Sequence, residues 1–368
     1  MKPSSPAAQP LAGPVPLPLL VTGIPGVPGY NAMEYFRARY PGQVFGLSQE
    51  DNRLAGGGDI LACNAEDGQR LARLFDQHRF AAVLNCGGNC ALKACELHPE
   101  LARLLNVGGV EHLLAQTVPR GLRLVHLSVD LVFSGDKPGG YVEEDRPDPV
   151  TVYGQTMALA EQRVRELDPK ACILRISLPM GVSLSGHAGA IDWISWRFRN
   201  HRPATLFFDE IRTPTYTDCL NRLYEVMLGR TESGIFHAGG PRRLSLYEIA
   251  QVINRVGGYD PRCLRGIPRK LAEPIPPRAG DVCMDSGKLL RTLGGNLLAP
   301  WPLAENLVPT DPDWHRQRPA DERRGPEELL RTLCLNPSRR QPAEGSHLGR
   351  RYVARSQGLE RAAPSGDG

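Results

Sequence analysis

The sequence predicts an α/β fold in which a doubly wound parallel sheet is joined by a smaller, discontinuous second domain. Three observations lead to this expectation. Short apolar or β-branched runs alternate with helical stretches, as in parallel strands linked by crossover helices. A glycine-rich turn directly follows the first apolar run. The length of 368 residues is too great for one small domain and suits a large α/β domain with a smaller one.

The N-terminal elements begin after a segment of biased composition. Residues 1–16 are rich in Pro, Ala and Ser and are expected to form a disordered leader. An apolar run from Leu17 to Val21 then predicts the first strand. After the glycine-rich turn, a helical stretch over 32–39 precedes a second strand over 44–47.

The alternation continues through the middle of the chain. Apolar runs predict strands over 80–85, 122–128 and 172–176, and periodic stretches predict helices over 67–78, 99–116 and 151–166. Strands joined by helices in this way pair in parallel through right-handed crossovers.

The C-terminal elements are fewer. Ser245 and Glu248 stand three residues apart before an apolar periodic run, which indicates a capping box at the start of a helix. From about Ala299 the periodicity is lost, apart from one short helix expected near 327–333. We therefore expect a large domain over 17–177 with 212–240, a smaller domain over 178–211 and 241–298, and a Pro/Arg-rich, largely disordered tail over 299–368.

Composition excludes several classes of protein. Nine cysteines lack the spacing of a disulfide framework, and the cluster Cys86, Cys90 and Cys95 lacks the CxxC pairs of zinc sites, so we expect free thiols, no metal and a cytoplasmic location. Prolines interrupt the apolar N-terminus, and no run of about 18 apolar residues occurs, so we expect no membrane association. The arginines of the tail lack interleaved aromatics, so we expect no nucleic-acid partner.

The glycine-rich turn is the first candidate site. Gly23, Gly26 and Gly29 form a GxxGxxG loop between the first strand and the first helix, where a backbone can approach a pyrophosphate and a helix N-terminus can bind it. The alternative is a turn without a ligand. Pro25 and Pro28 favour that alternative, because each removes one N–H donor.

The end of the second strand indicates the choice between NADP(H) and NAD(H). Leu47 and Ser48 offer no carboxylate to bind a ribose 2′-hydroxyl. Arg53 follows and could meet a 2′-phosphate, which favours NADP(H).

Residues 127–164 carry a longer pattern. They read LSVDLVFSG, then YVEED, then YGQTMALAE. This stretch resembles the dTDP-4-dehydrorhamnose reductase group of extended short-chain dehydrogenases/reductases, which show S-[ST]-D-Y-V-F-x-G, Y-x-E-x-D and Y-G-x-[ST]-K-x-x-x-E. It is also similar to the related regulatory β subunit of methionine adenosyltransferase.

Further pieces match in the same order. These are NCGG at 85–88, NV at 106–107, LR at 174–175 with Gly181, RTPT at 212–215 with Asp218, and PRAGD at 277–281 with Asp285 and Lys288. Together they span about Leu17 to Leu293, and their shared order and spacing is far more specific than any single piece. The resemblance implies a Rossmann-type sheet domain that binds the dinucleotide and a smaller domain that binds the substrate.

The resemblance also implies roles for individual residues. Tyr153 would act as the proton donor to a substrate carbonyl and Ser128 would hold the carbonyl oxygen. The cofactor would contact Gly23, Ile24, Gly26, Val27, Gly29, Asn85, Cys86, Gly87, Asn106 and Leu178. The substrate would contact Asp130, Val132, Phe133 and Arg278.

Met157 departs from the family pattern, because a lysine is expected there. It lies one helical turn after Tyr153 on the same face. In the family this lysine lowers the pKa of the tyrosine and binds the nicotinamide ribose, and a thioether does neither. Lys93 or Lys137 could fill the gap.

Two function classes remain open at this stage. The first is an NAD(P)-dependent oxidoreductase that reduces a nucleotide-activated 4-keto sugar, which the retained Ser128 and Tyr153 favour. The second is a catalytically impaired, cofactor-binding regulatory subunit that controls a partner enzyme, which Met157 favours. A sugar epimerase or dehydratase is a third interpretation. The sequence leaves the sugar undefined, and allows either a homo-oligomer or a complex with a partner.

Overall fold

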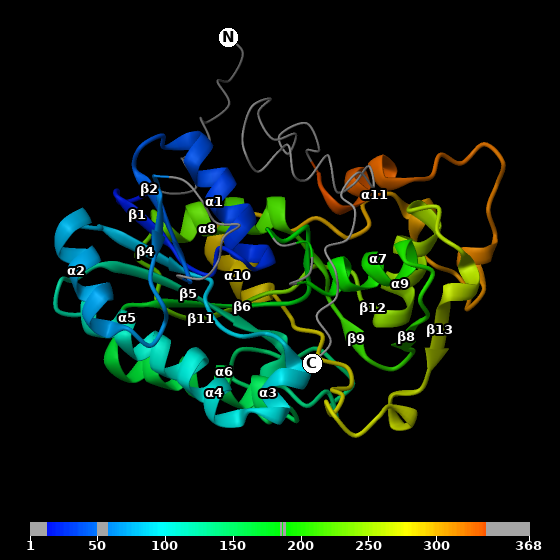
Figure 1. Cartoon of the computed structure of the whole chain (residues 1–368), viewed down its shortest axis with the longest axis horizontal. Coiled ribbons are helices and arrows are strands. Elements are labelled where there is room, and N and C mark those ends of the chain that lie inside the picture. Colours follow the sequence, from blue (N-terminus) through cyan, green and yellow to red (C-terminus); the bar gives the residue numbers. More distant parts are fainter. Residues whose placement is uncertain (1–12, 50–57, 185, 187–188, 336–368) are drawn as a thin grey trace, which may run out of the picture.

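The computed structural model describes residues 13–49, 58–184, 186 and 189–335. Within these residues, seven strands form one parallel sheet in the order β11-β6-β5-β4-β1-β2-β3 (Figure 1). The strands are β1 (Leu19–Val21), β2 (Val44–Ser48), β3 (Ile60–Ala62), β4 (Ala82–Asn85), β5 (Arg123–Val129), β6 (Cys172–Ile176) and β11 (Gly234–Ala238). The predicted doubly wound α/β fold is confirmed.

The order of the strands places a topological switch point between β1 and β4. The chain runs outward from β1 to β3, returns to β4 beside β1, and then runs outward in the other direction. In sheets of this kind ligands bind at the carboxyl ends of the strands next to the switch point. The glycine-rich turn after β1 and the segment after β4 therefore meet at the expected ligand edge.

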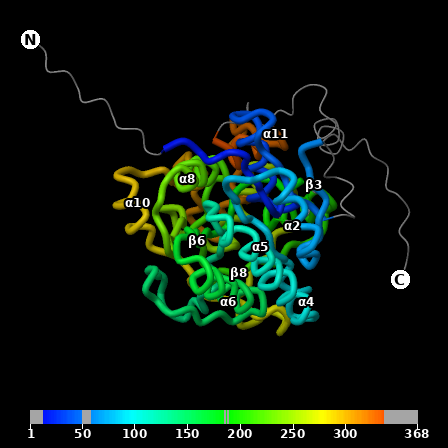
Figure 2. Tube along the Cα trace, turned by 90° about the vertical axis from the view of Figure 1, so that its left-hand side faces the viewer, coloured from blue at the N-terminus to red at the C-terminus, as the bar shows by residue number. Residues whose placement is uncertain are grey.

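The sheet is buried on both faces, as alternation along the strands requires. Leu19 and Val21 pack in one core cluster, and Leu20 between them packs in another on the opposite face. Helices α1 (Val27–Arg39), α8 (Thr217–Leu228) and α10 (Gly287–Leu293) lie on the first face, and α2 (Gly68–His78), α5 (Gly109–Thr117) and α6 (Val152–Leu167) on the second. Figure 2 shows this layering in a perpendicular view, with α8 above β6 and α6 below it.

Local capping fixes the starts of several helices. Thr151 accepts a hydrogen bond from the N–H of Gly154 at the start of α6. The predicted capping box of Ser245 and Glu248 is present at the start of α9 (Leu246–Val256). The helix expected over 99–116 is observed as α4 (Pro99–Arg103), a π-helical turn (Leu104–Gly108) and α5, after the short α3 (Leu92–Leu97).

A smaller assembly packs at the C-terminal edge of the sheet (Figure 1). It contains the parallel pair β8 (Ala204–Phe207) and β13 (Leu264–Ile267), with helices α7 (Ala190–Arg199), α9 and α11 (Pro326–Leu333). Two further two-residue pairings lie outside the main sheet: β7 (Pro179–Met180) pairs in parallel with β10 (Thr215–Tyr216), and β9 (Ile211–Arg212) pairs antiparallel with β12 (Leu244–Ser245).

Part of each end that the sequence analysis expected to be disordered is folded in the described residues. Val15, assigned to the leader, is 6% exposed, and the N–H of Gly13 donates to the carbonyl of Gly229. In the expected tail, Trp301 is fully buried and donates through Nε1 to the carbonyl of Thr332. The first part of that tail, up to residue 335, is therefore folded, because irregularly spaced large side chains bury themselves without a sequence period. The remainder of both ends lies outside the described residues.

No helix in the described part of the chain is both long and apolar enough to span a membrane.

Candidate functional site

The glycine loop is shaped by two close backbone approaches. Gly23 has φ +68°, and a Cβ there would lie 2.2 Å from the carbonyl oxygen of Cys86. A Cβ at Gly29 would lie 2.2 Å from the carbonyl oxygen of Gly23. Only glycine fits at both positions, so β1, the start of α1 and the turn after β4 are held tightly together. This is the backbone geometry in which a dinucleotide pyrophosphate can approach a helix N-terminus.

The prolines reduce the number of donors in this loop. Gly26 is the N-cap of α1, and its N–H already donates to the carbonyl of Gly23. Pro28 follows at the second helical position and Pro25 precedes the cap, so neither has an N–H to offer. Val27 and Gly29 supply the remaining N–H groups of the first turn. The loop thus fits a pyrophosphate sterically but offers it fewer hydrogen bonds.

The side chain of Ile24 turns inward rather than toward a ligand. It is 2% exposed and lies beside Gly46 and Ile60 of the neighbouring strands. At the end of β2, Ser48 is buried and its hydroxyl has no hydrogen-bond partner among the described residues. That orphaned hydroxyl lies where the adenosine ribose of a dinucleotide is bound in this fold. Arg53, on which the preference for NADP(H) depended, lies outside the described residues.

A buried hydrogen-bond network fixes the turn after β4. Thr22 donates to Asn85 Oδ1 at 2.6 Å, and the N–H of Gly87 donates to both side-chain oxygens. Asn85 Nδ2 lies 2.8 Å from Nδ1 of His126. Burial lowers the pKa of His126 to about 4, so the ring stays neutral and Nδ1 can accept. The network holds Cys86 and Gly87 against the glycine loop, where the cofactor residues were expected.

Asn106 joins this turn to α6. It lies in the π-helical turn, a local widening that often occurs at functional sites. Its Oδ1 accepts from the N–H of Asn89 at 2.5 Å, and its Nδ2 donates to the Thr156 hydroxyl at 2.9 Å. The expected cofactor residues Asn85, Cys86, Gly87 and Asn106 are therefore brought together. Leu178 follows β6 and accepts through its carbonyl from the N–H of Thr215.

Tyr153 and Met157 lie beside this turn in an apolar cluster. Tyr153 is 8% exposed and Met157 is 4% exposed, and both pack with Cys95, Val132 and other apolar groups. The Sδ of Met157 lies 3.9 Å from the position that a Cβ on Gly88 would take. Burial is the main cause that raises the pKa of Tyr153 well above its ordinary value of 10, and the charge of Arg212 lowers it only partly.

Neither lysine considered as a substitute is paired with Tyr153. Lys137 donates from Nζ to Asp145 at 2.7 Å and lies over the ring of Tyr141. Lys93 is exposed on α3. The cationic partner expected for Tyr153 is therefore not replaced by either of them.

Ser128 does not fit the role of carbonyl binder. Its side chain is fully buried and donates to Glu161 Oε1 at 2.5 Å. Glu161 in turn accepts two hydrogen bonds from Arg175, at 2.8 and 2.7 Å, so the hydroxyl belongs to a buried ionic network. The sequence motif located the right strand, but β alternation directs this hydroxyl toward the network rather than to a substrate site.

Val129 is the residue that sequence reasoning missed. It follows Ser128 at the end of β5, points to the other face of the strand, and packs against the cluster that contains Tyr153 and Met157. Alternation along the strand places Ser128 and His126 on one face and Val129 on the other, but it does not tell which of the two faces borders the site. The position beside the tyrosine cluster thus carries an isopropyl group instead of a hydroxyl.

Three of the four residues expected to contact substrate are buried. Val132 and Phe133 are fully buried, and Phe133 stacks on Tyr141 with ring centroids 4.1 Å apart. Asp130 is fully buried and binds Arg212 through two hydrogen bonds of 2.7 and 2.5 Å. These three side chains build the wall of the site and do not present an accessible surface to a ligand.

Arg278, the fourth, remains partly exposed. Its guanidinium lies over the ring of Phe207 at 4.6 Å, and 3.6 Å from Oε2 of the buried Glu210. Burial raises the pKa of Glu210, and Arg278 and Arg212 oppose that shift. Arg278 is therefore positioned to meet an anionic group. Among the described residues, no cluster of three or more His, Cys, Asp or Glu side chains could hold a metal.

Comparisons with known proteins agree with this geometry. The sequence profile of the family "RmlD substrate binding domain" matches residues 18–305. A dTDP-4-keto-6-deoxy-D-glucose reductase of Streptomyces niveus is 30% identical over 253 residues, which cover 68% of this chain and 82% of that protein. Methionine adenosyltransferase 2 subunit beta of Xenopus laevis is 30% identical over 194 residues, which cover 51% of this chain and 58% of that protein.

A solved structure supports the fold. The dTDP-4-dehydrorhamnose reductase of Bacillus anthracis, in complex with NADP, superposes with a TM-score of 0.66 at 19% identity, over 86% of this chain and 98% of that one. The chain spans only 65% of the length of a probable low-salt glycan biosynthesis reductase of Haloferax volcanii that it also matches. The profile match over most of the chain, together with the shared sheet, means that this chain belongs to the RmlD substrate-binding-domain family of extended short-chain dehydrogenases/reductases.

Proposed function

We propose that this chain binds a nicotinamide dinucleotide and a nucleotide-activated 4-keto sugar, and acts as a binding or regulatory subunit rather than as a reductase. The observation that carries the proposal is the apolar surrounding of Tyr153. Val129 and Met157 pack in its cluster, and the hydroxyl of Ser128 is turned away. A tyrosine in such a setting stays protonated and has no partner to replace its proton.

The cofactor half of the proposal is supported by the glycine loop and the turn after β4. Gly23 and Gly29 leave the space that a side chain would fill, and the Ser48 hydroxyl lacks a partner at the end of β2. In a reductase this dinucleotide would supply the hydride, whereas in the proposed binding role the residues of this chain only hold it. Pro25 and Pro28 are expected to weaken that binding. The absence of a carboxylate at Leu47 and Ser48 favours NADP(H) over NAD(H).

Two groups that carbonyl reduction would use are missing beside Tyr153, a hydroxyl where Val129 lies and a lysine where Met157 lies. In carbonyl reduction, negative charge develops on the substrate oxygen and must be met by positioned donors. Here Tyr153 is the one candidate donor of the predicted catalytic set that remains in the cluster. Loss of tuned acid catalysis costs roughly 10²- to 10⁴-fold in rate. One relative is named as a subunit of methionine adenosyltransferase, which supports a subunit role for this chain.

A slow reductase is the second candidate, and the position of Tyr153 favours it. Its ring lies near Arg212, whose charge opposes the rise in the tyrosine pKa. The Streptomyces relative is named as a reductase of a dTDP-linked keto sugar. In that case Tyr153 would donate its proton to the carbonyl oxygen of the same substrate class, while Arg278 would meet the nucleotide phosphates.

The test compares cofactor binding with turnover in the same preparations. We expect calorimetry to detect NADPH binding to the wild type, and nicotinamide absorbance to show no consumption of NADPH with dTDP-4-dehydrorhamnose. The double variant Val129→Thr/Met157→Lys returns a hydroxyl and a cation to the tyrosine cluster, so its turnover should exceed the wild-type background at least tenfold.

Ser128→Ala is the matched control. Because Ser128 bonds to Glu161 and does not face the substrate, its loss should lower the free energy of unfolding by about 1.5–3 kcal/mol and leave NADPH affinity unchanged. If the wild type consumes NADPH and Tyr153→Phe does not, the chain is a slow reductase and the proposed binding role is wrong. If the wild type does not bind NADPH, neither the binding subunit nor the slow reductase can use this cofactor.

A further inference from the structure

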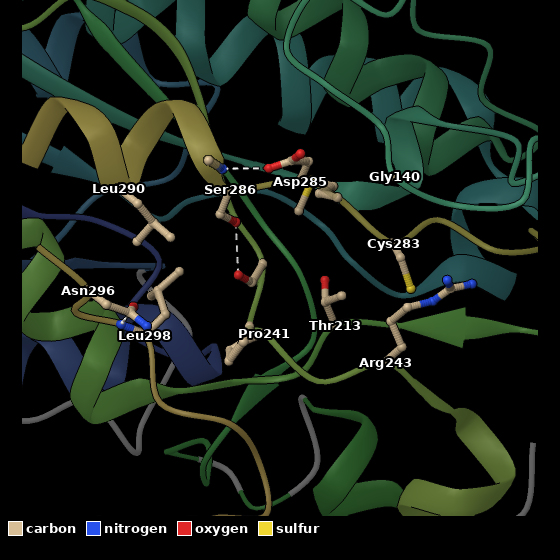
Figure 3. Close-up of a pocket in the computed structure, with 14 residues that line it drawn as sticks. Gly140, Thr213, Pro241, Arg243, Cys283, Asp285, Ser286, Leu290, Asn296 and Leu298 are labelled. Atoms are coloured by element: carbon tan, nitrogen blue, oxygen red, sulfur yellow. Dashed lines mark hydrogen bonds between the residues drawn. The ribbon is translucent and has the colours of Figure 1, made fainter.

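A cavity of about 310 Å³ lies beside β11, an edge strand of the sheet, and Figure 3 shows the residues that line it. Its walls come from the segment after β11, the segment that leads into α10, and Thr213 after β9. We propose that this cavity is a second binding site, for a neutral, hydroxyl-rich ring molecule of monosaccharide size. It goes beyond the proposed function, because no residue of the candidate site lines it.

The location separates this cavity from the cofactor site. The glycine loop follows β1, and the cavity follows β11, with β4, β5 and β6 between those strands. Four strand spacings of about 4.8 Å put roughly 19 Å between the end of β1, where the glycine loop begins, and the end of β11. A ligand here and a dinucleotide on the glycine loop can therefore be bound at the same time.

The volume fits a single sugar ring. At about 30 Å³ per water molecule, the cavity has room for about ten waters, which is at the lower end of the range for ligand sites. Gly239 keeps the space open, since a Cβ there would lie 2.4 Å from the Thr213 hydroxyl oxygen.

Thr213 supplies the polar group that needs a partner. The residue is 3% exposed, and its hydroxyl has no hydrogen-bond partner among the described residues. In Figure 3 this side chain reaches toward the space enclosed by Ser286 and Pro241. A buried hydroxyl left unpaired costs about 1–3 kcal/mol, so an apolar occupant would be disfavoured here and a hydroxylated one favoured.

The remaining walls match the two kinds of surface on a sugar ring. Leu290 and Leu298 give an apolar side for the ring carbons. Ser286 donates its proton to the carbonyl of Gly239 at 2.9 Å and keeps its lone pairs for a ligand hydroxyl. Asn296 uses Oδ1 to accept from the N–H of Leu298 and keeps its amide donors.

The charges at the rim argue for a neutral ligand. Among the described residues that line the cavity, Arg243 is the one cation, and it is paired with Asp281 just outside. The carboxylate of Asp285 also lies in the lining, where Oδ1 accepts from the N–H of Gly287. With its cation neutralised and a carboxylate close by, the cavity does not favour a phosphate or another anion.

Ligand-observed saturation-transfer NMR on the full chain tests the proposal. The probes are methyl α-glucopyranoside and methyl α-mannopyranoside, with cyclohexanol as a ring of one hydroxyl and inorganic phosphate as an anion. We expect at least one glycoside to bind saturably, more tightly than cyclohexanol or phosphate. Saturating NADPH should leave its signal unchanged.

Variants locate the binding in the cavity. Thr213→Val keeps the shape but removes the hydroxyl, and should weaken the glycoside by about threefold to tenfold, whereas Thr213→Ser should not. Leu290→Trp fills the cavity and should abolish the signal. Leu271→Trp, at an exposed leucine outside the lining, should leave it unchanged.

Four results would overturn the proposal. One is that neither glycoside binds the wild type, and another is that phosphate or cyclohexanol binds more tightly than both. The third is that Thr213→Val binds the glycoside as tightly as the wild type. This comparison tests the proposal even if Leu290→Trp fails to fold. Displacement of the glycoside by NADPH would instead place it in the cofactor groove and overturn the separate site.

Discussion

Met157 and Val129 change the chemistry around Tyr153 without disturbing its packing. Each fills the volume beside the tyrosine with an apolar side chain, and the cluster that contains them is continuous with Phe133 and Tyr141. A buried phenol in such surroundings favours its neutral form, because ionisation would place an unsolvated charge there. Burial is the largest cause of the raised pKa of Tyr153, and the charge of Asp130 raises it further.

The alkaline titration of Tyr153 tests this explanation. Because burial raises its pKa, Tyr153 should remain protonated at pH 10, where an exposed tyrosine is half ionised. The titration of Tyr153 is isolated as the difference in phenolate absorbance between a protein and the same protein that also carries Tyr153→Phe. Met157→Lys should move it to lower pH, since a neighbouring cation stabilises the phenolate.

Met157→Leu is the matched control, since it keeps the site apolar and should titrate like the wild type. A wild-type Tyr153 that ionises at or below pH 10 would contradict the apolar environment. Equal titration of Met157→Lys and Met157→Leu would mean that position 157 does not act on the tyrosine.

Ser128 and Val129 show what the sequence could supply at the residue scale. The motif around 127–135 located the strand end and its neighbourhood beside α6. It did not decide which of two adjacent side chains faces the site, because that depends on the pairing of β5 with β4 and β6. The buried partners of Ser128, Glu161 and Arg175, lie 33 and 47 residues away in the sequence, beyond the reach of local pattern.

At the scale of elements, the junction of β1 and α1 combines a conventional shape with an unusual composition. Gly23 and Gly29 were predicted from the spacing alone, and both occupy positions where a Cβ would meet backbone within 2.2 Å. Short-range rules also predicted the capping box at Ser245. They could not predict the π-helical turn at Asn106, which depends on contacts of that helix with α6.

Replacing Pro28 tests whether the loop limits cofactor affinity. Pro28→Ala provides one more N–H in the first turn of α1, directed at the position of a bound phosphate. We expect NADPH to bind about threefold to tenfold more tightly, as measured by calorimetry. Pro41→Ala, at an exposed proline beyond the end of α1, is the control and should leave affinity unchanged. Equal affinities in all three chains would mean that the first turn does not contact the phosphate.

At the scale of the whole molecule, one core joins parts that the sequence assigned to separate domains. The largest cluster includes Leu19 and Ala32 of the sheet region, Ile249 and Leu264 of the smaller assembly, and Leu333 of the expected tail. Patterns in the sequence mark elements, but they do not reveal which elements share a core. The boundary expected at Ala299 was wrong for this reason, since Trp301 and Trp314 occur without any period.

Truncation distinguishes this shared core from a dispensable tail. A chain that ends at Leu335 keeps Trp301, Trp314 and α11, whereas a chain that ends at Leu298 loses all three. Removing a large buried side chain alone costs about 3–5 kcal/mol, so the shorter chain should melt many degrees lower or fail to fold. Trp301→Ala in the full chain should show part of the same loss, because Trp301 also donates to Thr332 of α11. Trp193→Ala, at a 42% exposed tryptophan, is the control and should change the melting temperature little. If the chain ending at Leu298 melted at the temperature of the longer chain, residues 299–335 would lie on the surface as a tail, and the shared core would end at α10.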